Sequence, residues 1–339
     1  HSKEVFVCCL IVSLRCVFWV APSIRGGIDS PRPASQRAAA FVLTAAMLIT
    51  LAAPAFAGTW YIENGDITVK ASGTEGKNKV SQGNNPEVED TNTIITNQKT
   101  DTASSNTVTI EANGKNDKVE VTLKDVNIDT SSRNNAAVSV TGSGNTTIKL
   151  DGDNHLAGGN GIYSNSSGSL TISGDENDSL TAQGGDSRNG IYSVSGDVTI
   201  SGGTVTATGG NSTGSYGSGG DGIHSGSLTI SGGTVTAKGG SGEDGEDGGD
   251  GIRSFDPVTI SGGTVNANGG SGEDGSGGRG IISTKSVTIS GGTVNANGGS
   301  GKNGNGGNGI IGSGRVAISG GTVEAAGGNG STGGGSGIY

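Results

Sequence analysis

Cysteine is nearly absent from this 339-residue chain, and its three cysteines, Cys8, Cys9 and Cys16, all lie near the amino terminus. Beyond them, disulfide bonds, thiol nucleophiles and cysteine-ligated metal sites are excluded. Aromatic residues make up only 4% of the chain, which leaves too few for a large aromatic core. Beyond residue 57 there are only two histidines, His155 and His224, and neither lies in a known catalytic or metal-ligand motif.

The chain also lacks an excess of positive charge. Residues 1–57 hold five of the 21 Lys and Arg residues and two of the 31 Asp and Glu residues, so the remainder has a net charge of about −13. An acidic, glycine-rich surface of this kind argues against nucleic acid or an anionic membrane as the partner. Helical periodicity is missing as well, which argues against an α-helical fold.

Nearly the same phrase, Leu/Val-Thr-Ile-Ser-Gly followed by a short strand-like stretch and Gly-Gly, occurs six times between residues 169 and 328, with a three-residue insertion in the first copy. Its central isoleucines lie 28, 30, 30, 29 and 29 residues apart. A fixed period in this range is typical of a solenoid, in which each repeat buries its apolar face against its neighbours. The central isoleucines are Ile172, Ile200, Ile230, Ile260, Ile289 and Ile318.

The alternation inside one repeat predicts which solenoid forms. In residues 287–289, Val-Thr-Ile, the two aliphatic side chains share one side, and Val294 and Ala296 share a side in the next segment. Both pairs can face inward only if the chain bends at Ser290-Gly291-Gly292. With a third segment around Ile281, the repeat predicts an all-β, right-handed parallel β-helix of about 29 residues per coil. A disordered glycine-rich linker is the competing interpretation.

The amino-terminal region has the pattern of an export signal. An apolar run over residues 38–53 follows Arg37 and ends in Pro54-Ala55-Phe56-Ala57, a small-residue ending that predicts cleavage after Ala57 and a secreted or cell-surface protein. The run is too short for a stable membrane span. Residues 5–20 are also apolar and are interpreted as an extension before the natural start or a fragment boundary, with a second membrane segment as the alternative.

We expect three regions: residues 1–57 with the upstream extension and signal peptide, residues 58–160 with irregular amino-terminal coils, and residues 161–339 with regular glycine-rich coils. Residues 84–98, polar and proline-containing, are expected to form a long loop. The last three residues, Gly-Ile-Tyr, open another repeat, so we expect the natural protein to continue into further modules.

The residue after each Gly-Ile pair faces outward if the isoleucine faces inward. Stacked coils would therefore align Tyr163, Tyr192, His224 and Arg253 in one column. Rings and a guanidinium along a shallow groove suit the sugar rings of a polysaccharide, with Arg253 available to the carboxylate of an acidic sugar. An ordinary surface column without a ligand is the alternative.

Carboxylates cluster in the long glycine-rich loops, expected to be flexible, that precede each Gly-Ile pair. Such oxygen-rich clusters suit Ca²⁺, although neither an EF-hand spacing nor a calcium-binding nonapeptide occurs. A solvated acidic loop without metal is the alternative. The candidate ligands are Asp221, Glu243, Asp244, Glu246, Asp247, Asp250, Glu273 and Asp274.

The motifs Gly220-Asp221-Gly222-Ile223-His224 and Leu-Thr-Ile-Ser-Gly-Gly-Thr-Val at residues 228–235 resemble a bacterial family. That family consists of secreted or surface carbohydrate-binding domain-containing β-helix repeat proteins, common in Firmicutes. The resemblance covers residues 59–339 and implies polysaccharide binding, bound calcium and no firmly assigned activity. The acidic residue before Gly-Ile is kept only at Asp221 and Asp250, which limits any carried-over site to residues 221–252.

The leading hypothesis is a non-catalytic extracellular module that binds a polysaccharide, of acidic or plant cell-wall type. A structural stalk or adhesin region without a ligand of its own is the alternative. A polysaccharide lyase is a lesser one, because the β-helix fold alone does not imply an activity. Ice binding is another, because Thr204 to Thr206 and Thr234 to Thr236 would form a flat threonine array, which Glu324 interrupts.

Overall fold

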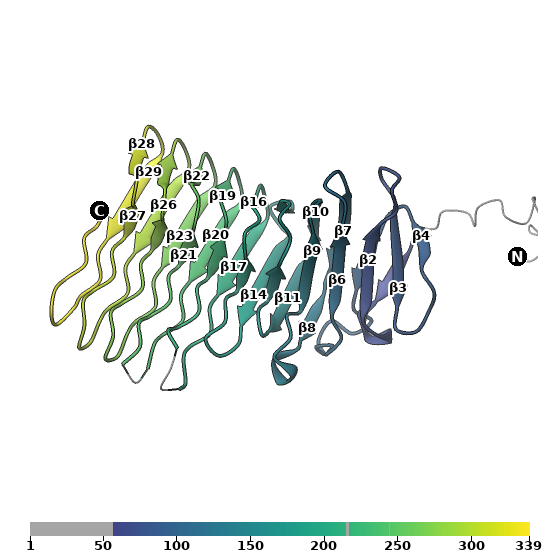
Figure 1. The fold of residues 1–339 in the computed structure, drawn as a ribbon, viewed down its shortest axis with the longest axis horizontal. Helices are drawn as coiled ribbons and strands as arrows, with labels where there is room; N and C mark the ends of the chain where they lie inside the picture. The colour runs from purple at the N-terminus through teal and green to yellow at the C-terminus, as the bar shows by residue number, and fades with distance from the viewer. Residues whose placement is uncertain (1–56, 215–216, 244) are drawn as a thin grey trace, which may run out of the picture. The chain divides into compact units, whose positions relative to one another are not determined.

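The computed structural model describes residues 57–214, 217–243 and 245–339. In this part of the chain nearly every regular element is a β-strand, and the strands of successive coils stack into three sheets (Figure 1). Paired residues of neighbouring coils, such as Ile230 with Ile260 and Ile260 with Ile289, are 30 or 29 positions apart. The predicted parallel β-helix is confirmed. The predicted signal peptide and apolar amino-terminal segments lie outside the described residues, apart from Ala57.

An eleven-stranded sheet contains the Gly-Ile segments. From β6 onward its strands are parallel, whereas β2, β3 and β4 pair antiparallel at one end. The expectation of a long loop over residues 84–98 was wrong, because β4 and β5 lie within it. In spatial order the strands are β4 (Val88–Asp90), β3 (Asn78–Gln82), β2 (Ile67–Ala71), β6 (Val108–Ala112), β9 (Val138–Gly142), β12 (Ile162–Ser164), β15 (Ile191–Ser193), β18 (Ile223–Ser225), β21 (Ile252–Ser254), β24 (Ile281–Ser283) and β27 (Ile310–Gly312).

A ten-stranded sheet contains the Val-Thr-Ile triplets. Their strands pair in parallel and in register, so each isoleucine lies beside the isoleucine of the next coil. In spatial order the strands are β1 (Thr59–Tyr61), β5 (Ile94–Thr96), β7 (Lys118–Lys124), β10 (Asn145–Asp151), β13 (Leu170–Ser173), β16 (Val198–Ile200), β19 (Leu228–Ile230), β22 (Val258–Ile260), β25 (Ser286–Ile289) and β28 (Arg315–Ile318).

An eight-stranded sheet completes each coil. It follows a bend at the Ser-Gly-Gly segment, where Gly292 has φ +79°, a left-handed conformation that favours glycine. The strands are β8 (Asn127–Asp129), β11 (Asp153–Gly158), β14 (Ser179–Gly184), β17 (Thr204–Thr208), β20 (Thr234–Lys238), β23 (Thr264–Asn268), β26 (Thr293–Asn297) and β29 (Thr322–Ala326). Two short 3₁₀-helices, η2 (Ile62–Asn64) and η3 (Ser131–Arg133), interrupt the strands.

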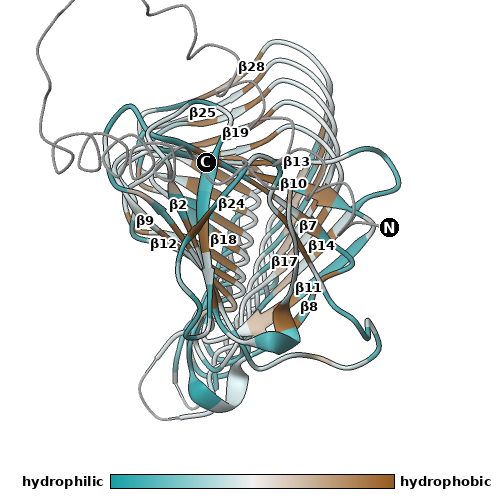
Figure 2. Ribbon diagram, turned by 90° about the vertical axis from the view of Figure 1, so that its right-hand side faces the viewer, coloured by the Kyte–Doolittle hydropathy of each residue, from teal (hydrophilic) through white to brown (hydrophobic). Residues whose placement is uncertain are grey.

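The core is a tube lined by small aliphatic side chains of the three sheets. Figure 2 shows hydrophobic residues, in brown, along the stacked strands. Ile230, Val235 and Ile252, one from each sheet, are fully buried. Burying each such side chain stabilises the fold by about 1.5–3 kcal/mol, and the neighbouring coils provide the cover. Ile318, in the last coil of this chain, is 44% exposed because no further coil covers it.

The glycine-rich segments between the eight- and eleven-stranded sheets are packed against one another. Within a coil the Gly249 amide donates to the Gly240 carbonyl at 2.8 Å, and the Gly240 amide donates to the Gly220 carbonyl of the preceding coil at 2.8 Å. A Cβ at Gly240 would lie 2.0 Å from the carbonyl oxygen of Gly210. The expectation of flexible loops was therefore wrong for these inner parts, where only glycine fits.

None of the helices in the described part of the chain has the length and hydropathy needed to cross a membrane.

Candidate functional site

The four residues of the predicted column lie side by side on the outer face of the eleven-stranded sheet. Tyr163 in β12 pairs with Tyr192 in β15, which pairs with His224 in β18, and His224 pairs with Arg253 in β21. Each lies between two buried residues of its own strand, so its side chain points away from the core. Their role in binding a glycan stays a prediction.

The rings of this column form a continuous ladder along the coils. Ring centroids are 5.7 Å apart for Tyr163 and Tyr192, 5.0 Å for Tyr192 and His224, and 4.9 Å for His224 and Phe255. The planes are tilted by 57° to 62°, which lies in the range that aromatic pairs favour. We name Tyr163, Tyr192, His224 and Phe255 the ring ladder.

Phe255 is the member of the ring ladder that sequence reasoning missed. It lies just after β21, and its side chain is 48% exposed. The repeat pattern points to the residue after each Gly-Ile pair, whereas Phe255 comes three residues after Ile252. An exposed phenylalanine in a chain with only five was the available signal.

A ladder of side-chain oxygens runs beside the rings. The Oδ1 of Asn189 accepts the Asp221 amide at 2.6 Å, the Oδ1 of Asp221 accepts the Asp250 amide at 2.7 Å, and the Oδ1 of Asp250 accepts the Arg279 amide at 2.6 Å. The Oδ1 of Asn160 likewise accepts the Asn189 amide at 3.0 Å. Because aspartate and asparagine both offer this oxygen, they exchange freely at this position of the repeat.

The second oxygens of Asp221 and Asp250 organise a charged cluster. Asp221 Oδ2 lies 2.9 Å from His224 Nδ1 and 3.1 Å from Arg253 Nε. Arg253 Nη2 lies 2.6 Å from Asp250 Oδ2, an ion pair that is close but not aligned as a hydrogen bond. Arg279 Nη1 lies 3.7 Å from Asp250 Oδ1. The carboxylates thus hold His224 and Arg253 in place.

Asp250 is the strongly perturbed acid of this cluster. Its side chain is fully buried, and burial together with the negative charge of Asp221 raises its pKa from 3.8 to about 6. The positive charges of Arg253 and Arg279 oppose this rise in pKa and do not cancel it. A substrate outside the coil has no access to this carboxylate.

Both ring nitrogens of His224 are accounted for by the structure: Nδ1 faces Asp221 and Nε2 is buried. Its Nδ1 faces the Asp221 carboxylate, so the neutral ring carries its proton there. Its Nε2 is buried and has no hydrogen-bonding partner among the described residues. His224 therefore contributes a ring edge and not an exposed proton-transfer group.

The predicted calcium ligands separate into two groups. Asp221 and Asp250 belong to the charged cluster, whereas Glu243, Glu246, Asp247, Glu273 and Asp274 lie in the glycine-rich loops; Asp244 lies outside the described residues. Glu273 pairs with Lys302, and Asp247 accepts the Ser276 amide at 2.7 Å. Among the described residues no three His, Cys, Asp or Glu side chains converge as a metal site would require. Calcium binding stays a prediction.

The outer face of the eight-stranded sheet carries the threonine array. Thr206 pairs with Thr236, Thr236 with Asn266, and Asn266 with Asn295, whose Nδ2 donates to Asn266 Oδ1 at 2.9 Å. The row then reaches Glu324 in β29. A carboxylate thus follows the uncharged part of the row.

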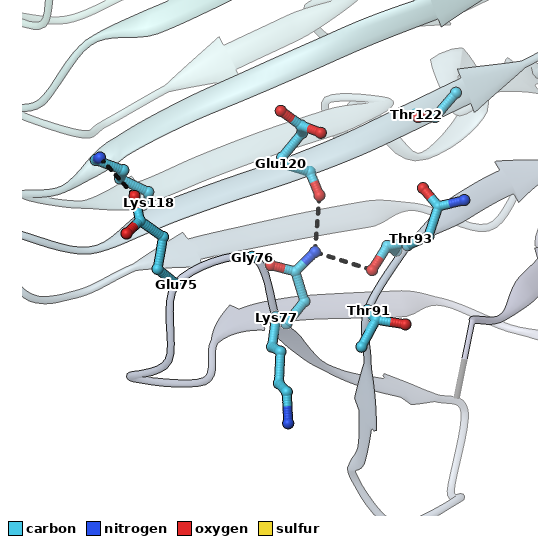
Figure 3. A pocket seen from close by; sticks show the side chains of 10 residues that line it. Glu75, Gly76, Lys77, Thr91, Thr93, Lys118, Glu120 and Thr122 are labelled. Atoms are coloured by element: carbon cyan, nitrogen blue, oxygen red, sulfur yellow. Dashed lines mark hydrogen bonds and ion pairs between the residues drawn. The ribbon is translucent and has the colours of Figure 1, made fainter. Parts of the chain in front are cut away.

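Two cavities of the described residues lie away from the ring ladder. A groove of about 630 Å³ follows the loop tips along Ser241, Ser271 and Ser300. A pocket of about 220 Å³ lies near the amino-terminal hairpin, where Lys118 pairs with Glu75 at 3.0 Å (Figure 3). The rings of Tyr163, Tyr192 and Phe255 are instead partly exposed at the surface, and an exposed row of rings suits a long polymer better than a small enclosed ligand.

Three consecutive coils match a family model described as the beta helix repeat, over residues 228–252, 258–281 and 287–310. The described residues thus form a parallel β-helix that contains beta helix repeats. No curated protein and no solved structure matches it. The matched segments contain β19, β20, β22, β23 and β26, and the first of them begins after His224 and contains Asp250.

Proposed function

We propose that this β-helix repeat protein is exported and binds a polysaccharide, without catalysing a reaction, along the ring ladder. The observation that carries the proposal is the continuous row of four rings, spaced 4.9 to 5.7 Å apart along the coil axis. An extended polysaccharide also repeats its sugar ring at about the spacing of stacked strands. Successive sugars can therefore contact successive coils.

The tilt and exposure of the rings support a contact with sugar. Tyr163 and Tyr192 are partly exposed, and the apolar ring of Phe255 is 48% exposed. Aromatic side chains at such sites combine a broad apolar surface with little loss of conformational entropy on binding. The tyrosine hydroxyls add donors and acceptors for sugar hydroxyls.

The charged cluster supports a positioning role. Arg253 is held by Asp221 and Asp250, and its side chain stays 35% exposed. Its fixed guanidinium can donate to a sugar hydroxyl or to the carboxylate of an acidic sugar. The two carboxylates face inward, so we assign them to holding His224 and Arg253 and not to acid–base chemistry.

Affinity electrophoresis tests the proposal. The exported protein is run through native gels that contain a neutral β-glucan, a galactomannan or a polyuronate. We expect retardation by at least one polymer, and Kd about tenfold weaker for Tyr192→Ala, which corresponds to about 1.4 kcal/mol. Thr206→Ala, on the outer face of the eight-stranded sheet, is the matched control and should bind as the wild type does.

The outcomes separate the functional hypotheses. A protein that folds by circular dichroism but is retarded by no polymer refutes the proposal and favours the structural stalk. Equal binding by the wild type and Tyr192→Ala would move the site away from the ring ladder. Retardation in the same gels with and without EDTA tests whether calcium at the loop carboxylates contributes to binding. Shortening of the polyuronate with formation of unsaturated products would favour a lyase.

A further inference from the structure

A buried carboxylate stands apart from the ring ladder, at the amino-terminal end of the described chain. Asp90 ends β4, the edge strand of the eleven-stranded sheet (Figure 1), and it is fully buried. Its Oδ2 accepts the Trp60 indole Nε1–H at 2.7 Å. Its Oδ1 accepts the amides of Gly58 and Asn92, both at 3.0 Å.

These three donors are all neutral. Among the described residues no lysine, arginine or histidine forms an ion pair with Asp90. Buried carboxylates are normally paired with a positive charge, because desolvating an unpaired charge is costly. Among the described residues, Asp90 thus has hydrogen-bond donors for both carboxylate oxygens but no positively charged group that would balance its charge.

The sequence indicates where that cation can come from. Gly58 follows Ala57, after which the small-residue ending predicts removal of the signal peptide. Ala57 is exposed, whereas Gly58 is buried with its nitrogen against Asp90. Hydrolysis of the Ala57–Gly58 peptide bond by a signal peptidase consumes one water, leaves a carboxylate on Ala57 and frees the Gly58 amine, which takes up a proton.

We propose that cleavage after Ala57 creates an α-ammonium group on Gly58, which forms an ion pair with Asp90 and stabilises the amino-terminal end of the β-helix. The nitrogen is already 3.0 Å from Oδ1, so cleavage adds a positive charge without moving an atom of the site. The Gly58 carbonyl also accepts the Ile94 amide at 3.2 Å, which ties this end to β5. The ion pair would thus join β4 of the eleven-stranded sheet to β1 and β5 of the ten-stranded sheet.

The identity of residue 58 agrees with this role. A Cβ at Gly58 would lie 2.7 Å from Trp60 Nε1 and 3.0 Å from Asp90 Oδ2. Any side chain would therefore displace the indole or the carboxylate. Glycine alone lets the terminal nitrogen reach Asp90 in this geometry.

Mass spectrometry of the protein after export of the full chain identifies its amino-terminal residue, which we expect to be Gly58. A second protein that begins at Ala57 moves the amine by one residue, about 3.8 Å. Both contain the compact unit Pro54–Tyr339 almost complete. Trp60 is the only tryptophan beyond Trp19, so its fluorescence in both proteins reports directly on the site.

We expect the protein that begins at Gly58 to melt about 5–10 °C higher at pH 6 by Trp60 fluorescence. Pairing raises the pKa of the α-amine above its ordinary value of about 8, so this advantage is present below pH ~8 and is lost as the pH rises through the raised value. The titratable groups Lys77, just before β3, Lys79 in β3 and Glu89 in β4 are common to both proteins, so their contributions cancel when the two proteins are compared.

Asp90→Asn supplies the control, since it keeps the acceptor oxygen and removes the charge. With Asp90→Asn in both, the protein that begins at Gly58 and the protein that begins at Ala57 should have the same melting temperature. Equal melting of the two proteins with Asp90 intact, an advantage that persists at pH 11, or a mature terminus other than Gly58 would each overturn the proposal. If Asp90→Asn does not fold by circular dichroism, the pH dependence of the first pair decides.

Discussion

Replacing Asp250 by asparagine should remove a pH dependence of stability that the charged cluster creates. The asparagine keeps the Oδ1 that accepts the Arg279 amide, as Asn160 and Asn189 do for their own neighbours. It removes only the ionisation of a fully buried carboxyl group. The comparison therefore separates the charge of Asp250 from its place in the oxygen ladder.

The magnitude follows from the pKa. Burial and the charge of Asp221 raise the pKa of Asp250 from 3.8 to about 6, so the folded protein holds this proton more tightly than the unfolded chain does. At about 1.36 kcal/mol per pKa unit, the wild type should lose roughly 2–3 kcal/mol of stability relative to Asp250→Asn as the pH rises from 4 to 7. The loss levels off as the pH passes through about 6 and is nearly complete at pH 7.

Chemical denaturation at pH 4, 5, 6 and 7, followed by circular dichroism, measures this difference in the free energy of unfolding. Asp197→Asn, at an exposed carboxylate, is the control and should show no comparable change. Asp221→Asn should reduce the pH dependence, because it removes one cause of the raised pKa. A difference between the wild type and Asp250→Asn that stays constant across the range would refute this account of the cluster.

Two further predictions concern the packing of the coils. Gly240→Ala should lower the melting temperature by several degrees in a thermal scan, because the added Cβ would lie 2.0 Å from the Gly210 carbonyl oxygen. Gly214→Ala is the control: open space surrounds Gly214, so the melting temperature should stay unchanged. Equal melting temperatures would contradict the packed glycine segments. Ile230→Ala should cost about 2–5 kcal/mol in denaturant unfolding, because it leaves a cavity in a fully buried row, and Thr229→Ala on the outer side should cost far less. Similar costs for the two variants would contradict the inward direction of Ile230.

Several features of the site needed the arrangement of the coils in space. Phe255 joins the ring ladder through the course of the chain after β21, which no repeat position specifies. The pairing of Asp221 with His224 and Arg253 depends on side-chain directions that the spacing of residues leaves open. The capture of the Gly58 nitrogen by Asp90 joins residues 32 positions apart in an irregular region.

The sequence by itself determined the β-helix, its coil length and the direction of its strand residues. It could do so because nearly identical triplets recur every 28 to 30 residues, and only neighbouring copies can cover their aliphatic faces. Tertiary structure alone decided which glycines form a packed layer, which carboxylates are buried and which charges meet. Those properties arise from contacts between coils, where a shift of one side chain changes burial and pairing without changing the repeat.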